Sequence, residues 1–313
     1  MNPSLIKGCL KVFELGLSED LSEFDHSAAA LSGVERNTRA VVIAKESAVF
    51  CGEAMVMALQ QLIRRDDYRV EISCKVRDGQ HLLKGSPVVS FQGNGRHILC
   101  LERVFLNLIS RLSGISTAVA QAVSIVQDEA QKRRAPRITH TRKLLPGYRM
   151  LDLYAVQVGG GFLHRTNLSA GVMLKENHLA LFREKKRTRS GHIAFAIECA
   201  KKNAPHTLKI EVEVCNQEEA ILAFDGGADI LMLDNFSPAE IRQTLKAVVK
   251  IADRKKVSVP LIEVSGGITL ENLSSYVLPG VDVISMGSIT TSVKPVDFSL
   301  LFKGSTPALA FGS

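Results

Sequence analysis

The chain has 313 residues and a hydrophobic content of 46%, which is enough to bury one large core or two of ordinary size. Its formal net charge of +7 favours an anionic ligand, and nucleic acid is disfavoured because aromatic residues make up only 5% of the chain and tryptophan is absent. The cysteines are scattered and lack metal-ligand spacing, which argues against a disulfide-stapled protein. We expect no signal peptide and find no apolar run long enough to cross a membrane. These features together predict a cytoplasmic protein.

The N-terminal part of the chain predicts a small α+β sandwich. Strands are expected where β-branched residues are enriched or alternate with polar ones, at residues 39–49, 68–76 and 88–91. Helices are expected where apolar residues recur at helical spacing, at residues 1–37, 52–63 and 102–113. Gly114 is expected to cap the last of these helices or to join two domains, and Arg103 lies in its first turn.

From residue 137 onward, short apolar strands alternate with helices. Residues 138–141 and 171–174 are predicted to be strands, and residues 150–158 a helix that the glycines 159–161 end. Capping boxes mark later helix starts at Ser237 to Glu240 and, more weakly, at Asn216 to Glu219. Alternating strands and helices require a parallel sheet, because each right-handed crossover returns the chain to the same edge. The pattern therefore predicts a closed or nearly closed α/β barrel, with an open doubly wound sheet as the alternative.

Charged residues follow the ends of these predicted strands. The cations are Arg142, Lys143, His164, Arg165 and Lys175, and such a cluster repels itself unless a highly charged anion lies within it. Two carboxylates, Glu213 and Asp234, follow later strands and are expected to have lowered pKa values among so many cations. Glycine turns at Ser265-Gly266-Gly267 and Gly287-Ser288 would let backbone N–H groups approach a phosphate. These residues together predict a phosphorylated sugar bound beside a molecule with several carboxylates.

Ordered motifs along most of the chain resemble the quinolinate phosphoribosyltransferase family, the carboxylating nicotinate-nucleotide pyrophosphorylases of NAD biosynthesis. They run from about residue 39 to residue 298 and include AVVIAKESAVFCGEAM, VRDGQHLLKG, ERVFLNLISRLSGIST, THTRKLLPG, AVQVGGGFLHR, GVMLKENH, IEVEV, LMLDNF, EVSGGI and ISMGSIT. The resemblance implies phosphoribosyl transfer from phosphoribosyl pyrophosphate (PRPP) to quinolinate with decarboxylation, which yields nicotinate mononucleotide, pyrophosphate and CO₂.

The resemblance also implies an architecture. It divides the chain into an N-terminal sandwich of residues 1–113, joined by residues 292–313, and an incomplete parallel α/β barrel of residues 114–291. It implies a homodimer, or a larger assembly of such dimers, in which the helix carrying Arg103 reaches into the barrel mouth of the other subunit.

The family's functional residues carry over motif by motif. Quinolinate would be bound by Arg103 from the other subunit and by Thr141, Arg142, His164 and Arg165. Lys143 and Lys175 would contact substrate and neutralise the diphosphate, and both are implied to be catalytic together with Glu213 and Asp234. The two carboxylates would also take the ribose hydroxyls and Mg²⁺. The 5′-phosphate would lie on Ser265, Gly266, Gly267, Gly287 and Ser288.

Some positions depart from the family pattern and keep alternatives open. His140 stands where an acidic residue usually precedes the TRK motif, and Leu144, Leu145, Ser169-Ala170 and Thr291 also differ. A related phosphoribosyltransferase acting on another acidic heteroaromatic, of the type associated with molybdenum transport, is one alternative. A Schiff-base lyase that uses Lys143 or Lys175 is another, and a nucleic-acid-binding protein is the least favoured.

Overall fold

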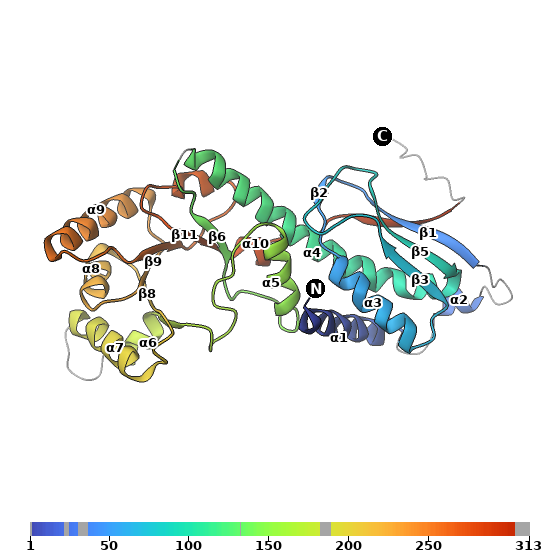
Figure 1. Cartoon of the computed structure of the whole chain (residues 1–313), viewed down its shortest axis with the longest axis horizontal. Coiled ribbons are helices and arrows are strands. Elements are labelled where there is room, and N and C mark those ends of the chain that lie inside the picture. The colour runs from blue at the N-terminus through green and yellow to red at the C-terminus, as the bar shows by residue number, and fades with distance from the viewer. Residues whose placement is uncertain (1, 22–24, 31–36, 132, 182–188, 304–313) are drawn as a thin grey trace. The chain divides into compact units, whose positions relative to one another are not determined.

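The computed structural model describes residues 2–21, 25–30, 37–131, 133–181 and 189–303. The chain forms two compact units, shown in Figure 1. The first, here called the sandwich unit, comprises Met1–Ala120, Leu144–Gly160 and Val293–Ser313. The second, here called the barrel unit, comprises Gln121–Lys143 and Gly161–Ser292. Within these units the structure has both the sheet-rich N-terminal part and the α/β part that the sequence predicts.

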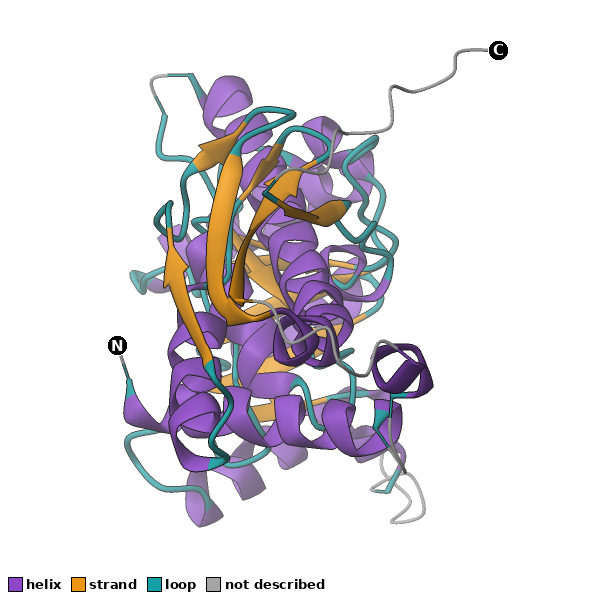
Figure 2. Ribbon diagram, turned by 90° about the vertical axis from the view of Figure 1, so that its right-hand side faces the viewer, coloured by secondary structure: helices purple, strands orange, loops and turns teal. Residues whose placement is uncertain are grey.

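The sandwich unit is built on an antiparallel sheet with the strand order β12-β1-β5-β3. Its strands are β12 (Phe298–Phe302), β1 (Asn37–Ala44), β5 (Pro87–Asn94) and β3 (Val70–Cys74), and the long strands are prominent in Figure 2. The predicted strand over 39–49 is in fact two, because the chain bends after Ala44 and resumes as β2 (Ala48–Val49), which pairs with β4 (His81–Leu82). β12 pairs with β1 from Ala44↔Phe298 to Ala40↔Phe302, so the late chain completes the first sheet.

Helices cover this sheet and fill its core. They are α1 (Pro3–Asp20), α2 (His26–Ala30), α3 (Glu53–Arg65), α5 (Arg149–Val158) and the first part of α4 (Gly95–Ala130). Asn2 caps α1 by accepting a hydrogen bond from the Ser4 N–H at 2.9 Å. Four phenylalanines form the fully buried centre of the unit: Phe13, Phe50, Phe91 and Phe105.

Helix α4 is much longer than the sequence suggests. The prediction that it would end near Gly114 is wrong, because α4 runs unbroken for 36 residues with Gly114 inside it. A Cβ atom at Gly114 would lie 2.5 Å from the backbone oxygen of Lys294 and 2.8 Å from the side chain of Val293. The glycine is therefore required for close packing against the returning chain rather than for a helix end.

Residues 144–160, assigned to the barrel from sequence, belong to the sandwich unit because polar contacts hold α5 there. Arg111 binds the buried Asp152 with two hydrogen bonds, at 3.0 Å from Nε and 2.8 Å from Nη2. The Ser116 hydroxyl donates to the Ala155 oxygen at 2.8 Å, and the Tyr154 hydroxyl donates to the Asp78 carboxylate. Burial raises the pKa of Asp152 despite the opposing effect of Arg111, which makes this ion pair a costly and specific link.

The barrel unit contains a six-stranded parallel sheet with the order β6-β11-β10-β9-β8-β7. Its strands are β6 (Arg137–His140), β11 (Val283–Met286), β10 (Leu261–Ser265), β9 (Ile230–Asp234), β8 (Ile210–Val214) and β7 (Val172–Leu174). β6 and β7 are the edges, so the barrel is incomplete, as expected. The segment at Phe162 lies beside β6, where it forms an isolated parallel bridge with Thr139.

Helices alternate with these strands, as a parallel sheet requires. They are α6 (Glu176–Ala180), α7 (Arg189–Asn203), α8 (Gln217–Asp225), α9 (Pro238–Lys255), the 3₁₀ helix η2 (Leu273–Tyr276) and α10 (Ser288–Thr291), and several are labelled in Figure 1. Both predicted caps are confirmed: Ser237 and Glu240 bond reciprocally at the start of α9, and Asn216 accepts from the Glu219 N–H at 2.9 Å. No helix in the described part of the chain combines the length and apolarity needed to cross a membrane.

Candidate active site

The strands of the barrel unit direct alternate residues into its interior. Because the side-chain period of a strand is two, Glu211 and Glu213 on β8 face inward together, as do Glu263 and Ser265 on β10. The last inward residue of each strand lies at its carboxyl end, where a cavity of about 600 Å³ opens. In α/β barrels this end of the strands carries the active site.

This cavity brings together nearly all the residues singled out from the sequence. Its lining includes Thr141, Arg142, Lys143, His164, Arg165, Lys175, Glu213, Asp234, Ser265, Gly266, Gly267, Gly287 and Ser288. Arg103 is the exception, because it is exposed on α4 in the part of the helix that belongs to the sandwich unit. The expectation that cations and carboxylates at successive strand ends would converge on one cavity is therefore met within the barrel unit.

The two carboxylates of the cavity have different partners. Glu213 forms an ion pair with Lys175. Asp234 accepts a hydrogen bond from the Asn235 amide at 2.7 Å. The expectation of a lowered pKa is wrong for Asp234, since burial and the charge of Glu213 raise its pKa more than Lys175 and Lys143 lower it. Asp234 therefore holds its negative charge at a cost, which a bound cationic group would relieve.

The first glycine turn is shaped by Asn235. Gly266 has a φ of +93°, and a Cβ there would lie 2.3 Å from Asn235 Oδ1 and 2.6 Å from the Asn235 backbone nitrogen. That nitrogen donates to the Ser265 oxygen at 2.9 Å, and Asn235 itself has a φ of +59°. Only glycine fits position 266, and the turn consequently brings backbone rather than side chains to the cavity wall.

The second glycine turn is tied to the loop that carries Lys143. Thr290 donates from its hydroxyl to the Lys143 oxygen at 3.0 Å, and the Lys143 N–H donates to Thr141 Oγ1 at 3.2 Å. A Cβ at Gly287 would come within 3.3 Å of Lys143 Cδ. Thr291, one of the departures from the family pattern, also lines the cavity and donates from its hydroxyl to the Gly287 oxygen at 3.0 Å. The lysine and the turn are therefore positioned as one assembly.

The structure shows what His140, a residue with no role predicted from the sequence, contacts. The side chain is fully buried, and its Nε2 accepts a hydrogen bond from the His164 backbone N–H at 3.2 Å. Its Nδ1 is 2.8 Å from the Thr141 oxygen and so carries the ring proton. Burial lowers the pKa of His140, and the nearby His164 lowers it further. A neutral imidazole thus anchors the backbone of the His164-Arg165 segment.

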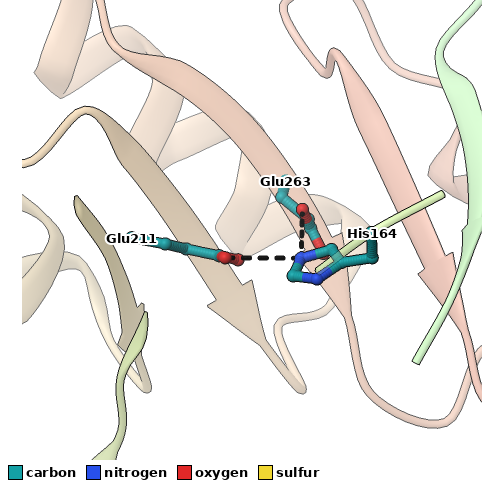
Figure 3. A group of neighbouring side chains, drawn as sticks. All are labelled: His164, Glu211 and Glu263. Atoms are coloured by element: carbon teal, nitrogen blue, oxygen red, sulfur yellow. Dashed lines mark ion pairs between the residues drawn. The ribbon is translucent and has the colours of Figure 1, made fainter. Parts of the chain in front are cut away.

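The sequence interpretation missed two interior carboxylates next to His164. Its Nε2 lies 3.3 Å from Glu211 Oε2 and 3.4 Å from Glu263 Oε2, and Figure 3 shows the ring between the two acids. Both residues lie within motifs of the family resemblance, Glu211 in IEVEV and Glu263 in EVSGGI, which assign them no role. The alternation of acids and apolar residues in IEVEV was the available signal, because it places both glutamates of β8 on the same face.

Comparisons with known proteins match both parts of the chain to one family. Residues 25–113 match the family described as quinolinate phosphoribosyl transferase, N-terminal domain, and residues 115–301 match its C-terminal domain. A probable carboxylating nicotinate-nucleotide pyrophosphorylase of Methanocaldococcus jannaschii is 38% identical, covering 93% of this chain and 96% of the relative. The human carboxylating nicotinate-nucleotide pyrophosphorylase is 35% identical, covering 91% and 88%.

A solved structure extends the similarity to the fold. The nicotinate-nucleotide pyrophosphorylase of Francisella tularensis superposes with a TM-score of 0.80 at 31% identity, covering 97% of this chain and 98% of that one. With both domains matched in order and relatives aligned over nearly their whole length, the chain belongs to the quinolinate phosphoribosyltransferase family.

Proposed function

We propose that the protein transfers the phosphoribosyl group of PRPP to the ring nitrogen of quinolinate, with loss of one carboxylate as CO₂, to give nicotinate mononucleotide and pyrophosphate. The observation that carries the proposal is the composition of one cavity: cations for the anionic groups of both substrates, two carboxylates for the ribose, and two glycine turns for a phosphate. The names of the relatives, which specify the carboxylating reaction, support it.

Quinolinate would bind on the side of Arg142 and Arg165. A guanidinium binds a planar carboxylate with two parallel hydrogen bonds, which suits a ring with two adjacent carboxylates. Arg165 is half-buried, and burial followed by the charge of Arg142 lowers its pKa. Two guanidiniums that repel each other in a partly desolvated site gain stability when a dianion binds between them. Thr141, which also lines the cavity, would add a hydroxyl contact.

PRPP would occupy the part of the cavity lined by the glycine turns. Gly266, Gly267 and Gly287 lie there, and backbone N–H groups of such turns would suit the 5′-phosphate. Ser265 and Ser288 add hydroxyls beside these turns. Lys143 and Lys175 would neutralise the diphosphate, which must leave with its charge stabilised.

Glu213 and Asp234 would act at the sugar. As the ring nitrogen attacks C1 and the C1–O bond to pyrophosphate breaks, positive charge develops on the ribose ring. Two carboxylates facing that ring would stabilise the charge, and binding it would relieve the raised pKa of Asp234. The alkylated ring nitrogen then accepts the electron pair of the breaking C2–carboxylate bond, and C2 takes up a proton as CO₂ leaves.

The same carboxylates fit a magnesium ion. Mg²⁺ prefers oxygen ligands and retains several waters, so one or two carboxylates together with substrate phosphates suffice to hold it. Glu213 and Asp234, which both line the cavity, offer such a donor set. When bound, the ion would neutralise charge on the departing pyrophosphate.

We further propose a homodimer in which the exposed Arg103 on α4 completes the quinolinate site of the other subunit. Its exposure leaves it available for such a contact. All six cysteines are free thiols, consistent with the reducing cytoplasm where we place the enzyme.

The test is an assay of purified protein with quinolinate, PRPP and Mg²⁺, in which nicotinate mononucleotide and released CO₂ are measured by mass spectrometry. Nicotinate, which lacks the 2-carboxylate, serves as the matched control substrate and should release no CO₂. If PRPP binds and quinolinate gives no product, the proposal fails and another acidic heteroaromatic must be sought. Borohydride trapping of a lysine adduct would instead indicate a Schiff-base enzyme.

A further inference from the structure

The interior of the barrel unit is unusually acidic below the substrate cavity. Barrel interiors are normally filled by branched apolar residues, yet Glu211 and Glu263 occupy this layer with only 4% and 2% of their surfaces exposed. Each also has one oxygen, Oε1, without a hydrogen-bond partner among the described residues. Burying a carboxylate is expensive unless it is paired, so this pair requires an explanation.

His164 is the partner the two acids share. Its ring lies between them, with Nε2 3.3 Å from Glu211 and 3.4 Å from Glu263, and the three residues come from β8, β10 and the segment beside β6 (Figure 3). His164 and Glu263 line both the substrate cavity and a second cavity of about 440 Å³ at the other end of the barrel. The cluster is therefore part of the partition between the two, directly below the substrate site.

The hydrogen bonds of the ring show where its proton lies. Nδ1 accepts the Arg165 backbone N–H at 2.8 Å, so in the neutral ring the proton is on Nε2, facing the acids. An imidazolium also carries this Nε2 proton, but its protonated Nδ1 cannot accept the Arg165 N–H, so the bond from Arg165 belongs to the neutral ring. A metal ion between the same three residues would need the lone pair of Nε2, which in this neutral ring carries the proton. The observed bonds therefore place a proton, not a metal, between His164 and the two acids.

The cluster is linked to the substrate cavity through Arg165. This arginine follows His164 in the chain, its backbone N–H is bonded to the His164 ring, and its Nε is buried without a partner in the described part of the chain. The His164 backbone N–H is in turn held by the neutral His140. Fixing the His164 ring therefore fixes the backbone from which the Arg165 guanidinium enters the cavity.

We propose that Glu211 and Glu263 are positioning residues which, by holding the Nε2 proton of His164, place Arg165 to bind a carboxylate of the substrate. The proposal rests on the proposed function for the identity of that substrate. It also gives His164 a role beyond the direct quinolinate contact implied by the resemblance, because its Nε2 faces the two acids.

Titration of His164 provides a measurement that a purely structural cluster would not affect. Burial alone would lower its pKa, but the hydrogen bonds and charges of Glu211 and Glu263 outweigh burial and raise it to about 10. The other charged or titratable groups close by are His140, which stays neutral, and Arg165, whose charge opposes protonation. Removing one acid should therefore move the His164 midpoint towards its ordinary value of about 6.5.

The experiment uses Glu211→Gln and Glu263→Gln, which keep the shape and remove the charge, with the exposed Glu218→Gln on α8 as the matched control. ¹⁵N-histidine NMR, with His164 assigned from His164→Asn, should show Nε2 protonated and a midpoint well above 6.5 in the wild type and a lower one in both Gln variants. The KM for quinolinate should rise roughly ten- to a hundredfold, as for loss of a charge-assisted hydrogen bond, while kcat and the KM for PRPP stay within about twofold.

Two results would overturn the proposal. One is an ordinary His164 midpoint in the wild type, which would mean that the acids do not hold its proton. The other is an unchanged quinolinate KM in both variants despite a shifted midpoint, which would limit the cluster to a structural role. If the wild type does not convert quinolinate at all, the proposed function fails, and the NMR titration still decides whether the acids hold His164. If it does convert quinolinate and His164 titrates normally, only the present inference fails.

Discussion

Replacing Gly266 by alanine should damage the cavity in a way that its neighbour Gly267 does not. The new Cβ would lie 2.3 Å from Asn235 Oδ1 and 2.6 Å from the Asn235 backbone nitrogen, and backbone cannot move aside as a flexible side chain can. A side chain at the φ of +93° costs about 1–3 kcal/mol, and the overlap costs about 1–3 kcal/mol more. A loss of about 2–6 kcal/mol corresponds to a fall in Tm of roughly 4–24 °C, at about 2–4 °C per kcal/mol for a domain of this size.

Gly267→Ala is the matched control, because its φ is +61° and nothing lies within 4 Å of the added carbon. It should lose only the backbone contribution, about 1–2 kcal/mol, which corresponds to a fall in Tm of roughly 2–8 °C. Since Asn235 follows Asp234, Gly266→Ala should also raise the KM for PRPP, whereas Gly267→Ala should change it less. Calorimetry and steady-state kinetics on both proteins provide the comparison. Equal Tm values, or an unaltered PRPP KM in Gly266→Ala, would refute the reasoning that Asn235 limits this turn.

Three further predictions concern charge. Glu213→Gln and Asp234→Asn should each lower kcat by about a hundredfold or more with little change in quinolinate KM, and unchanged turnover in both would remove them from catalysis. Arg103→Ala mixed with Lys175→Ala should regain partial activity through mixed dimers, and no recovery after proven subunit exchange would exclude a shared site. Because the pKa of His164 is raised to about 10, its protonation should stabilise the fold fully below pH 6.5, and this contribution should be lost as the pH rises towards about 10. The Tm of the wild type should therefore fall over this pH interval by more than the Tm of His164→Asn.

The sequence predicted correctly those features that depend on the residues of a single strand or helix. The period-two and helical patterns predicted the parallel barrel, and the strand ends predicted which cations would line the cavity, because parallel strands all end on one face. The capping boxes at Ser237 and Asn216 were equally local and equally reliable.

The predictions failed for features that depend on contacts between segments far apart in the sequence. Gly114 resembles a helix end, but its missing Cβ makes room for Lys294, far away in the chain. Arg111 resembles a solvated helix charge, but it holds the buried Asp152 and so draws residues 144–160 into the sandwich unit. The raised pKa of Asp234 has the same origin, because burial at the base of a cavity depends on every strand around it. Local patterns carry none of this information.

The pairing of β12 with β1 also imposes an order of events on protein synthesis. A ribosome releases Asn37–Ala44 early and Phe298–Phe302 only after the whole barrel, yet these strands are hydrogen-bonded neighbours. Until β12 emerges, β1 has an open edge of unpaired N–H and C=O groups that another nascent chain could occupy. The N-terminal region should consequently be aggregation-prone as an isolated fragment, and its sheet should close only after translation of the barrel is complete.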